Sequence, residues 1–430
     1  MTFTSVLLFL IVVPDEAPRA PMPAACPPGA PIAIEGASIL TMDSAALLRD
    51  ATILVQAGKV AAINPPSLPV NSCRIAARAK FIVPGLSDIH VHTNARELPI
   101  FLANGVTLVR EMNGTPAHVA LRERIARGEI AGPRLLVTSP LLVGTPLQYR
   151  HKLITSADEA YKAAHDAKDA GYDFLKIYDG LSLAAYDALV EAGRTLGLRL
   201  DGHIPVSVGL ERVLNAGQAI QHMDKIAMAL GGHGADSGKL DRARRLFTGK
   251  RAWVTPTIAS LRVLDAARTV EYANWLDRPE MAYVDSSSLG WWRSLSGSGP
   301  ARARSEFYNF QVALLPILRA AGVRVLLGTD AANPMMVAGF AVHEELATLQ
   351  RDGGFSAFDA LLSATKNVGE FLDDSLRGRI VVGAPADLII ADANPLEDLA
   401  TLRKPAGVLV NGRWYDRQQL DSLLASTRQR

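Results

Sequence analysis

The chain has 430 residues, of which 49% are hydrophobic and 20% are charged, as is typical of a globular protein with a sizeable core. Lysine and arginine total 45 against 43 aspartates and glutamates, and the net charge of +2 gives no electrostatic case for nucleic acid or an anionic membrane surface as a partner. The length suffices for a barrel of about 250 residues and a second, smaller module.

An apolar octet occupies residues 6–13 near the N-terminus. It is too short for the roughly 20 residues that a membrane helix needs, so no stable membrane span is expected. Followed by small residues, it is typical of a secretory signal peptide. We therefore predict that residues 1–25 are a signal peptide or leader and that the protein is exported to the periplasm or secreted. The usual positive charge before the octet is missing, which leaves a cytoplasmic protein with an unstructured leader as the alternative.

The two cysteines are Cys26 and Cys73. Without a Cys-x-x-Cys motif, the sequence excludes a structural zinc finger and a disulfide scaffold. A single Cys26–Cys73 bridge is compatible with export, and two unrelated thiols are the alternative.

Both ends of the chain are rich in short β-type segments. These segments lie at residues 32–35, 37–41, 51–55, 60–63, 378–381, 386–390, 405–410 and 413–415. Asn411-Gly412 between two apolar runs is a strong hairpin signal. We predict that residues 30–83 and 376–420 pair into one small β-sandwich built from both chain ends.

Between these ends, short apolar strands alternate with amphipathic helices. The predicted strands are residues 81–92, 107–111, 134–138, 174–178, 198–203, 219–222, 253–257 and 323–330. Eight strands alternating with helices predict an α/β fold, a (β/α)8 TIM barrel over residues 84–375. The long segment 264–299 is expected to be irregular and to cover the mouth of the barrel.

Polar side chains lie at the predicted carboxyl ends of five of these strands. They are His90, His92, Lys176, His203, His222 and Asp330. His90 and His92 share one face of a strand, so both can reach the same metal ion. The carboxyl ends of all eight strands meet at one face of a barrel, and active sites lie on that face. Each residue also has a structural reading: hydrogen-bonded histidines, a lysine whose ammonium reaches solvent, and Asp330 as a helix N-cap.

Four motifs together resemble the amidohydrolase superfamily. They are Pro-Gly-Leu-Ser-Asp-Ile-His-Val-His at 84–92, Gly-Val-Thr-Leu-Val-Arg at 105–110, Gly-Thr-Asp at 328–330 and Gly-Ala-Pro-Ala-Asp-Leu at 383–388. The chain is most similar to the prolidase-like and imidazolonepropionase-like group, and the resemblance extends from Ile32 to Trp414.

The resemblance implies a centre with two divalent metal ions, expected to be zinc, although cobalt, manganese and iron suit similar ligands. His90, His92 and Asp330 would hold one ion, and His203 and His222 the other. A carbamate on Lys176 would bridge both. The ions would generate a bridging hydroxide that attacks the substrate, with Asp330 as general base and then general acid.

Substrate contacts are assigned to Tyr178, for which a packed aromatic is the alternative, and to His151. Arg150 could bind a substrate carboxylate, but a solvated loop arginine is the favoured reading. Dipeptidase-type relatives carry a Gly-Gly-His-Gly element after the third strand, but this chain has it at 231–234, where a flexible lid is expected. This departure argues against Xaa-Pro dipeptides as substrates. Arg110 and Glu111 are interpreted as closing a structural ion pair rather than as supports of the site.

These observations predict a metal-dependent hydrolase that cleaves an amide-type C–N bond of a small molecule, such as an N-acyl amino acid, a dipeptide or a cyclic amide. The same metal site could serve a lactonase or a phosphoesterase. A non-catalytic metal-retaining binding protein is the alternative from another class. The sequence leaves a homo-oligomer open.

Overall fold

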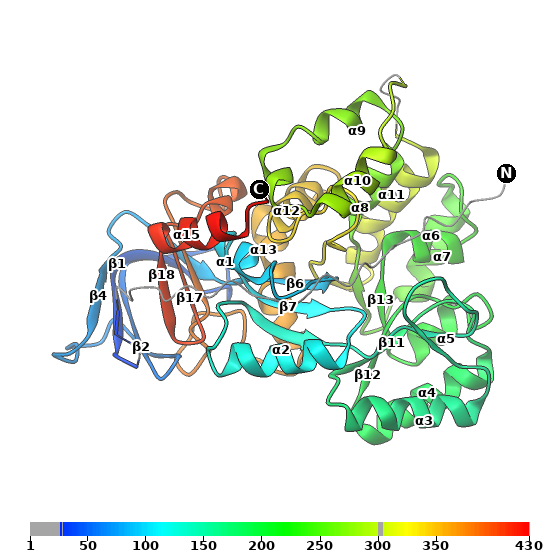
Figure 1. Cartoon of the computed structure of the whole chain (residues 1–430), viewed down its shortest axis with the longest axis horizontal. Helices are drawn as coiled ribbons and strands as arrows, with labels where there is room; N and C mark the ends of the chain where they lie inside the picture. The colour runs from blue at the N-terminus through cyan, green and yellow to red at the C-terminus, as the bar shows by residue number, and fades with distance from the viewer. Residues whose placement is uncertain (1–25, 28, 300–303, 430) are drawn as a thin grey trace.

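The computed structural model describes residues 26–27, 29–299 and 304–429, and it shows a mixed α/β protein with parallel sheets (Figure 1). The predicted signal peptide, residues 1–25, lies outside the described residues.

The two ends of the chain meet in one eight-stranded sheet. Its order is β18-β17-β16-β5-β1-β2-β3, with β4 also pairing β1. The strands are β1 (Ile32–Leu40), β2 (Leu47–Gln56), β3 (Lys59–Ile63), β4 (Cys73–Ala76), β5 (Phe81–Pro84), β16 (Leu388–Ala391), β17 (Gly407–Val410) and β18 (Arg413–Asp416). Antiparallel pairing of β5 with β16 joins the N-terminal strands to the C-terminal ones. Strands from both ends of the chain therefore pair within one sheet.

Two details of this sheet differ from the prediction. The segments 32–35 and 37–41 form one strand with an irregular register around Gly36, whose φ is +76°. The strand predicted at 378–381 is wrong, because these residues form turns. Ile380 is nevertheless buried in the core of this sheet, so its hydrophobicity reflects packing without strand pairing.

The predicted strand 81–92 is divided at Gly85 into β5 and β6 (Leu86–Val91), which belong to different sheets. The backbone passes so close to Thr107 that a Cβ at Gly85 would lie 2.1 Å from Thr107 Oγ1, so only glycine fits. His92 follows the end of β6 instead of lying within the strand.

All strands of the central region run parallel, in a three-stranded sheet ordered β6-β7-β8 and a seven-stranded sheet ordered β10-β9-β11-β12-β13-β14-β15. They are β7 (Val106–Glu111), β8 (Arg134–Val137), β9 (Leu142–Val143), β10 (Lys152–Leu153), β11 (Phe174–Ile177), β12 (Arg199–Gly202), β13 (Ala219–Gln221), β14 (Trp253–Thr255) and β15 (Arg324–Val325). Each of the eight predicted strands is present, although the last is shortened to two residues.

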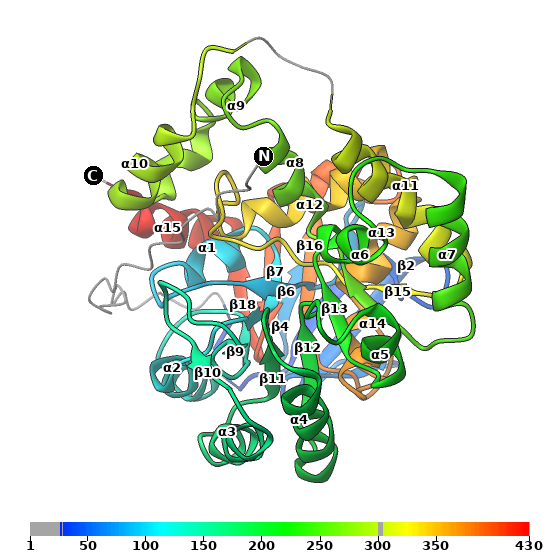
Figure 2. The same cartoon turned by 90° about the vertical axis from the view of Figure 1, so that its right-hand side faces the viewer.

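Backbone contacts link the two parallel sheets at both edges. Thr138, just after β8, forms a bridge to Phe174 of β11. On the other side, the Ile89 amide of β6 donates to the Leu327 carbonyl, 2.9 Å away, in the segment after β15. Figure 2 shows these strands in the middle of the molecule, with helices outside them.

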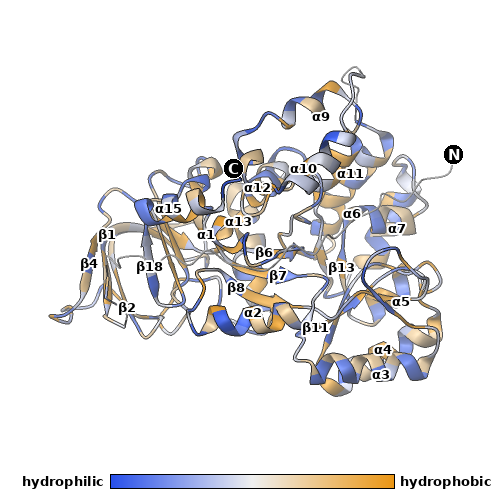
Figure 3. Cartoon of the chain, in the orientation of Figure 1, coloured by the Kyte–Doolittle hydropathy of each residue, from blue (hydrophilic) through white to orange (hydrophobic). Residues whose placement is uncertain are grey.

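The helices lie mainly between consecutive parallel strands. They are α1 (Leu98–Ala103), α2 (Pro116–Ala126), α3 (Ala157–Asp169), α4 (Leu183–Leu196), α5 (Leu210–Asn215), α6 (Met223–Ala229), α7 (Ser237–Phe247), α8 (Ile258–Asp265), α9 (Val270–Trp275), α10 (Ser286–Ser294), α11 (Glu306–Ala320), α12 (Phe340–Arg351), α13 (Ala357–Ala364), α14 (Lys366–Phe371) and α15 (Arg417–Thr427), with 3-10 helices η1 (Pro279–Tyr283) and η2 (Leu399–Arg403). In Figure 3, α3 and α4 carry hydrophilic and hydrophobic residues, whereas β8 is mainly hydrophobic. Among the described helices, none has the length and apolar character needed to cross a membrane.

The segment 264–299 is not irregular as expected, because it contains α9, η1 and α10. Trp292 and Tyr272 are buried, and the Tyr272 hydroxyl donates to the Trp292 carbonyl at 3.0 Å. The segment packs on Met335 and Met336, which follow β15, in a core of its own.

A disulfide joins Cys26 to Cys73 at the start of β4, with a Cα–Cα distance of 5.5 Å. It ties residues before β1 to the sheet formed by the chain ends. The bridge confirms the pairing of the two cysteines over the alternative of unrelated thiols.

Reduction of this disulfide should lower the stability of the protein. A cross-link between residues 47 apart restricts the unfolded chain, which is worth about 2–4 kcal/mol. Thermal unfolding with and without reductant measures the loss. The double variant Cys26→Ser/Cys73→Ser should melt at one temperature under both conditions. Two titratable thiols in the denatured, unreduced protein would contradict the bridge.

Candidate functional site

The six polar residues predicted at strand ends converge on one pocket of about 200 Å³. They come from β6 and the residue after it, from β11, and from the residues that follow β12, β13 and β15. All six line the pocket: His90, His92, Lys176, His203, His222 and Asp330. The structure therefore brings together every residue predicted to hold metal.

Asp330 lies at the centre of this group. Its Oδ1 is 3.3 Å from His90 Nε2 and 3.4 Å from His92 Nε2, and its Oδ2 is 3.8 Å from His222 Nδ1. Ligand atoms of His90, His222 and Asp330 all lie within 4.8 Å of one another, close enough to hold one ion. The tightest group among the described residues thus pairs His90 with His222, whereas the prediction grouped His90 with His92.

Hydrogen bonds orient the imidazole of His90. Its Nδ1 lies 2.6 Å from Gln221 Oε1, and Gln221 Nε2 donates to Asp201 Oδ1 at 2.6 Å. The amide of Gln221 is held by this second bond, so its oxygen accepts the Nδ1 proton of His90. The Nε2 lone pair of His90 is left facing Asp330 and can bind a metal ion.

His222 and His203 are oriented in the same way. His222 Nδ1 is 2.8 Å from Thr257 Oγ1, which itself donates to the Pro256 carbonyl and must therefore accept from the imidazole. His203 Nδ1 is 3.2 Å from Asp179 Oδ1. Burial lowers the pKa of His222 and takes that of His203 to about 3, which keeps both rings neutral, as metal ligation requires.

A buried ion pair stands behind His90. Arg110 Nη2 lies 2.5 Å from Asp201 Oδ2, and neither side chain is exposed. Glu111 has a different role: its Oε1 is 3.5 Å from His92 Nδ1, and it accepts from the Thr93 amide. The prediction of a structural ion pair holds for Arg110, which pairs with Asp201. For Glu111 it is wrong, because Glu111 faces a predicted metal ligand, His92.

Two of the six residues have strained backbones. His222 and Asp330 have φ values of +69° and +60°, a conformation that costs non-glycine residues about 1–3 kcal/mol. Asp88 holds the turn before Asp330, since its carboxylate accepts from the amide and hydroxyl of Thr329 at 3.0 and 2.7 Å. Burial raises the pKa of Asp88 to about 7. Such strain is typical of positions where side-chain direction matters for function.

Lys176 carries a buried amine that makes no hydrogen bond to the residues that the structure describes. The side chain is 1% exposed, and its Nζ has no hydrogen-bond partner within the described chain. A buried ammonium without a partner is costly. Burial lowers the pKa of Lys176 to about 8, so about a tenth of the amine is neutral at pH 7.

Of the proposed substrate groups, Tyr178 lines the pocket and His151 does not. The Tyr178 hydroxyl is 2.8 Å from that of Tyr149, and its ring centroid is 4.0 Å from that of His203. His151 Nδ1 lies 2.6 Å from the Tyr149 carbonyl. Arg150 is bonded to backbone carbonyls, among them that of Gly114 at 2.8 Å.

Other lining residues were not identified from the sequence, because they follow no strand-end motif. They are Asn113, Leu141, Tyr149, Asp224, Lys225, Leu261, Leu264 and Asn333. The glycine-rich loop 231–234 is attached to α7, since Lys239 Nζ donates to the carbonyls of Gly232 and Gly234 at 2.8 and 2.9 Å.

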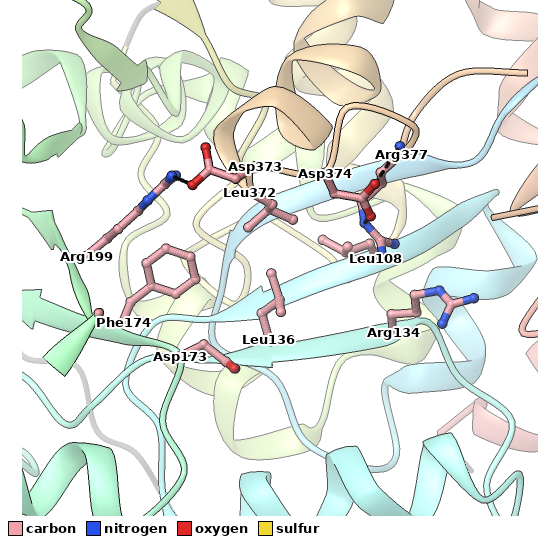
Figure 4. A pocket seen from close by; sticks show the side chains of 11 residues that line it. Leu108, Arg134, Leu136, Asp173, Phe174, Arg199, Leu372, Asp373, Asp374 and Arg377 are labelled. Carbon is pink, nitrogen blue, oxygen red and sulfur yellow. Dashed lines mark hydrogen bonds and ion pairs between the residues drawn. The ribbon is translucent and has the colours of Figure 1, made fainter. Parts of the chain in front are cut away.

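A second cavity, of about 400 Å³, opens at the amino ends of β8, β11 and β12 (Figure 4). Its arginines are paired: Arg199 with Asp373, and Arg377 Nε with Asp374 Oδ2 at 3.2 Å. Arg134 binds Asp387 at 2.7 Å. The arginines of this cavity are thus engaged in ion pairs with neighbouring aspartates. The six-residue pocket at the carboxyl ends of the parallel strands is therefore the candidate active site.

Comparison with known families identifies the chain. Residues 81–415 match the model of the amidohydrolase family, which is most of the chain. The chain belongs to the amidohydrolase family. This amidohydrolase is therefore a hydrolase of carbon–nitrogen bonds, and its family is generally metal-dependent.

Solved structures show that this amidohydrolase shares its fold with other members. A protein assigned as a prolidase from Bifidobacterium longum has a TM-score of 0.71 and 24% identity, covering 93% of this chain and 100% of its own. The bottromycin amidohydrolase has a TM-score of 0.75 and 22% identity, covering 92% and 89%. A prolidase complexed with N-methylphosphonate-L-proline has a TM-score of 0.68 and 19% identity, covering 90% and 100%. A search of curated proteins finds no match.

Removal of the Gln221 amide should weaken metal binding by this amidohydrolase. In Gln221→Leu, His90 loses the acceptor for its Nδ1 proton, and such losses typically cost 10- to 100-fold in metal affinity, so about that range is expected. Competition with a chromophoric chelator measures the affinity, and circular dichroism checks the fold.

Gln311→Leu is the matched control, because Gln311 is a buried glutamine of α11 that donates to the Phe307 carbonyl. Its metal affinity should stay at the wild-type value. Equal metal affinities in the two variants would contradict the role of Gln221.

Proposed function

We propose that the protein is a binuclear metal-dependent amidohydrolase that cleaves an amide-type C–N bond of a small molecule. The observation that carries the proposal is the convergence of four imidazoles and a carboxylate around the unpartnered Nζ of Lys176. Conversion of this buried amine into a carbamate anion would explain why it lies among so many potential metal ligands. The family match and the neighbouring folds support the chemistry.

The donor set fits two divalent ions. His90, His92 and Asp330 would hold one ion, and His203 and His222 the second. The neutral amine of Lys176 would attack carbon dioxide, forming an N–C bond and releasing one proton, and the two oxygens of this carbamate would bridge the ions. Imidazole and carboxylate donors suit zinc. His222 of the second proposed set lies near His90 and Asp330 of the first, so the two sets meet in one small pocket.

Asp330 would move the proton during hydrolysis. Burial alone would raise the pKa of Asp330, but His222, His92 and Lys176 outweigh this effect and lower it, so the carboxylate is ionised at rest. When bound, the ions would activate a water and polarise the scissile carbonyl. Asp330 would accept the proton of the attacking water and deliver it to the departing nitrogen.

The side chains behind the six residues would keep this geometry fixed during the reaction. Gln221, Thr257 and Asp179 each hold one histidine by its Nδ1. The Tyr178 ring lies beside that of His203, and we propose that its hydroxyl donates a hydrogen bond to a substrate carbonyl.

We also propose that the two parallel sheets form one closed (β/α)8 barrel, with the sheet of the chain ends as a separate β-sandwich domain. The contacts Thr138–Phe174 and Ile89–Leu327 support closure. The division at Gly85 supports a boundary near residue 84. The Cys26–Cys73 disulfide and the apolar octet support our proposal that the protein is exported.

The substrate proposal is an N-acyl amino acid, a dipeptide or a cyclic amide. Metal analysis of the purified protein, followed by a screen of these amides together with lactones and organophosphates, tests it. Two divalent ions per chain and turnover confined to amides are expected. A metal-free protein would overturn the proposal, as would turnover confined to esters or a metal-loaded protein without any turnover.

Replacement of Asp330 by asparagine should abolish most turnover of the amide found in that screen. The amide cannot accept the proton, and loss of a general base typically lowers kcat by about 10²–10⁴-fold. The control Asp373→Asn changes an aspartate at the cavity on the opposite side and should leave kcat unchanged. Turnover retained by Asp330→Asn, with the fold intact, would reject the assignment.

Loss of the amine in Lys176→Ala should release metal, because the two ions lose their bridging anion. Metal content by mass spectrometry should fall, and added short-chain carboxylic acids should restore it. Lys162→Ala, which removes an exposed lysine of α3, should keep its metal. Full metal content in Lys176→Ala without added acid would contradict the carbamate bridge.

A further inference from the structure

Lys225 lies in the wall of the active-site pocket and has no role in metal binding. It is the third residue of α6, and its side chain is 20% exposed. Besides Lys176 and the imidazoles, no other basic side chain lines the pocket in the described part of the chain. Lys225 therefore presents a positive charge to whatever the pocket binds.

Lys225 forms an ion pair with Asp179, and this pair is a loose one. Asp179 Oδ2 lies 3.6 Å from Lys225 Nζ, beyond the range of about 2.7–3.2 Å of a good N–H···O hydrogen bond. The other carboxylate oxygen of Asp179 faces His203 Nδ1 at 3.2 Å. The side chain of Asp179 is 48% exposed, so solvent screens its attraction for Lys225.

The place of Lys225 in α6 is also electrostatically unfavourable. The first turn of a helix carries a partial positive charge, which disfavours a lysine. Lys239 is likewise in a first turn, that of α7, but it donates to two backbone carbonyls. Lys225 makes no comparable hydrogen bonds among the described residues. A lysine in an unfavourable helix position, without hydrogen bonds that offset the cost, is a candidate for a role in binding.

The rest of the pocket wall is suited to an amino-acid side chain. Leu141, Leu261 and Leu264 line it together with Tyr178. Asp179 lies between Lys225 and the imidazole of His203, with one carboxylate oxygen facing each of them. In an N-acyl amino acid, three bonds separate the scissile carbonyl carbon from the α-carboxylate carbon, a span below roughly 4 Å. A substrate whose carbonyl lies at the histidines can therefore extend its carboxylate toward Lys225.

We infer that Lys225 is a specificity-determining residue, which binds the free carboxylate of the amino acid released by hydrolysis and so selects acyl-amino acids over neutral amides. The inference rests on the proposed function of the same site. A charge-assisted hydrogen bond from the ammonium would hold the carboxylate. The apolar wall favours leucine-like amino acids.

A competing role for Lys225 is structural. Through Asp179 it could help to hold His203 in place. A structural role would affect all substrates alike, whereas carboxylate binding affects only substrates that carry one. The comparison of an acid with its carboxamide separates the two roles.

The experiment uses the metal-loaded full chain with N-acetyl-L-leucine and N-acetyl-L-leucinamide. The wild type should prefer the acid at least tenfold in kcat/KM. Lys225→Met should lower kcat/KM for the acid by about 10- to 150-fold, the range for a hydrogen bond to a charged group. Its kcat/KM for the carboxamide should change less than threefold. Lys225→Arg should keep most of the preference, and Lys162→Met should match the wild type.

Equal losses for acid and carboxamide in Lys225→Met would overturn the inference in favour of the structural role. An unchanged preference would overturn it as well. If the wild type hydrolyses neither compound, the proposed function fails for this substrate class, and calorimetric Kd values for both compounds then test Lys225 alone. A Kd for the acid that rises at least tenfold in Lys225→Met, with the carboxamide unchanged, supports the inference. An unchanged Kd, or no binding of the acid by the wild type, overturns it.

Discussion

The structure of the site depends on a chain of buried polar contacts that begins with Arg110 and Asp201. Neither side chain is exposed, and a charge buried in this way is tolerated only when it is paired and hydrogen-bonded. Asp201 is held by Arg110 and in turn fixes the amide of Gln221, which fixes the tautomer of His90. These contacts join β7, β12, β13 and β6, which belong to both parallel sheets, so the relative position of the two sheets and the direction of His90 are determined together.

The sequence predicted most of the parallel strands and the six residues at their ends. Alternating apolar strands and amphipathic helices carry a local signal, and the carboxyl ends of parallel strands meet by geometry. His90, His92, Lys176, His203 and His222 could therefore be grouped before any contact was known. The same local signal predicted amphipathic helices between the strands, and α3 and α4 are two of those observed.

The remaining features depend on contacts between distant residues. Gln221, Asp201 and Thr257 carry no distinguishing pattern, and only the fold places them next to a histidine. The division at Gly85 follows from the approach of Thr107. Residues 378–381 look like a strand because Ile380 is buried, but that burial is a tertiary effect. Lys225 was overlooked because a lysine within a helix is usually on the solvated face.

The pairing of β5 with β16 has a consequence for how the chain is made. The sheet of the chain ends stays incomplete until the last strands, β16 to β18, have left the ribosome. Strand β5 pairs with β1 on one side, but its partner on the other side is synthesised about 300 residues later. Contacts so distant along the sequence form slowly. The nascent chain thus keeps one edge of β5 without its strand partner during synthesis.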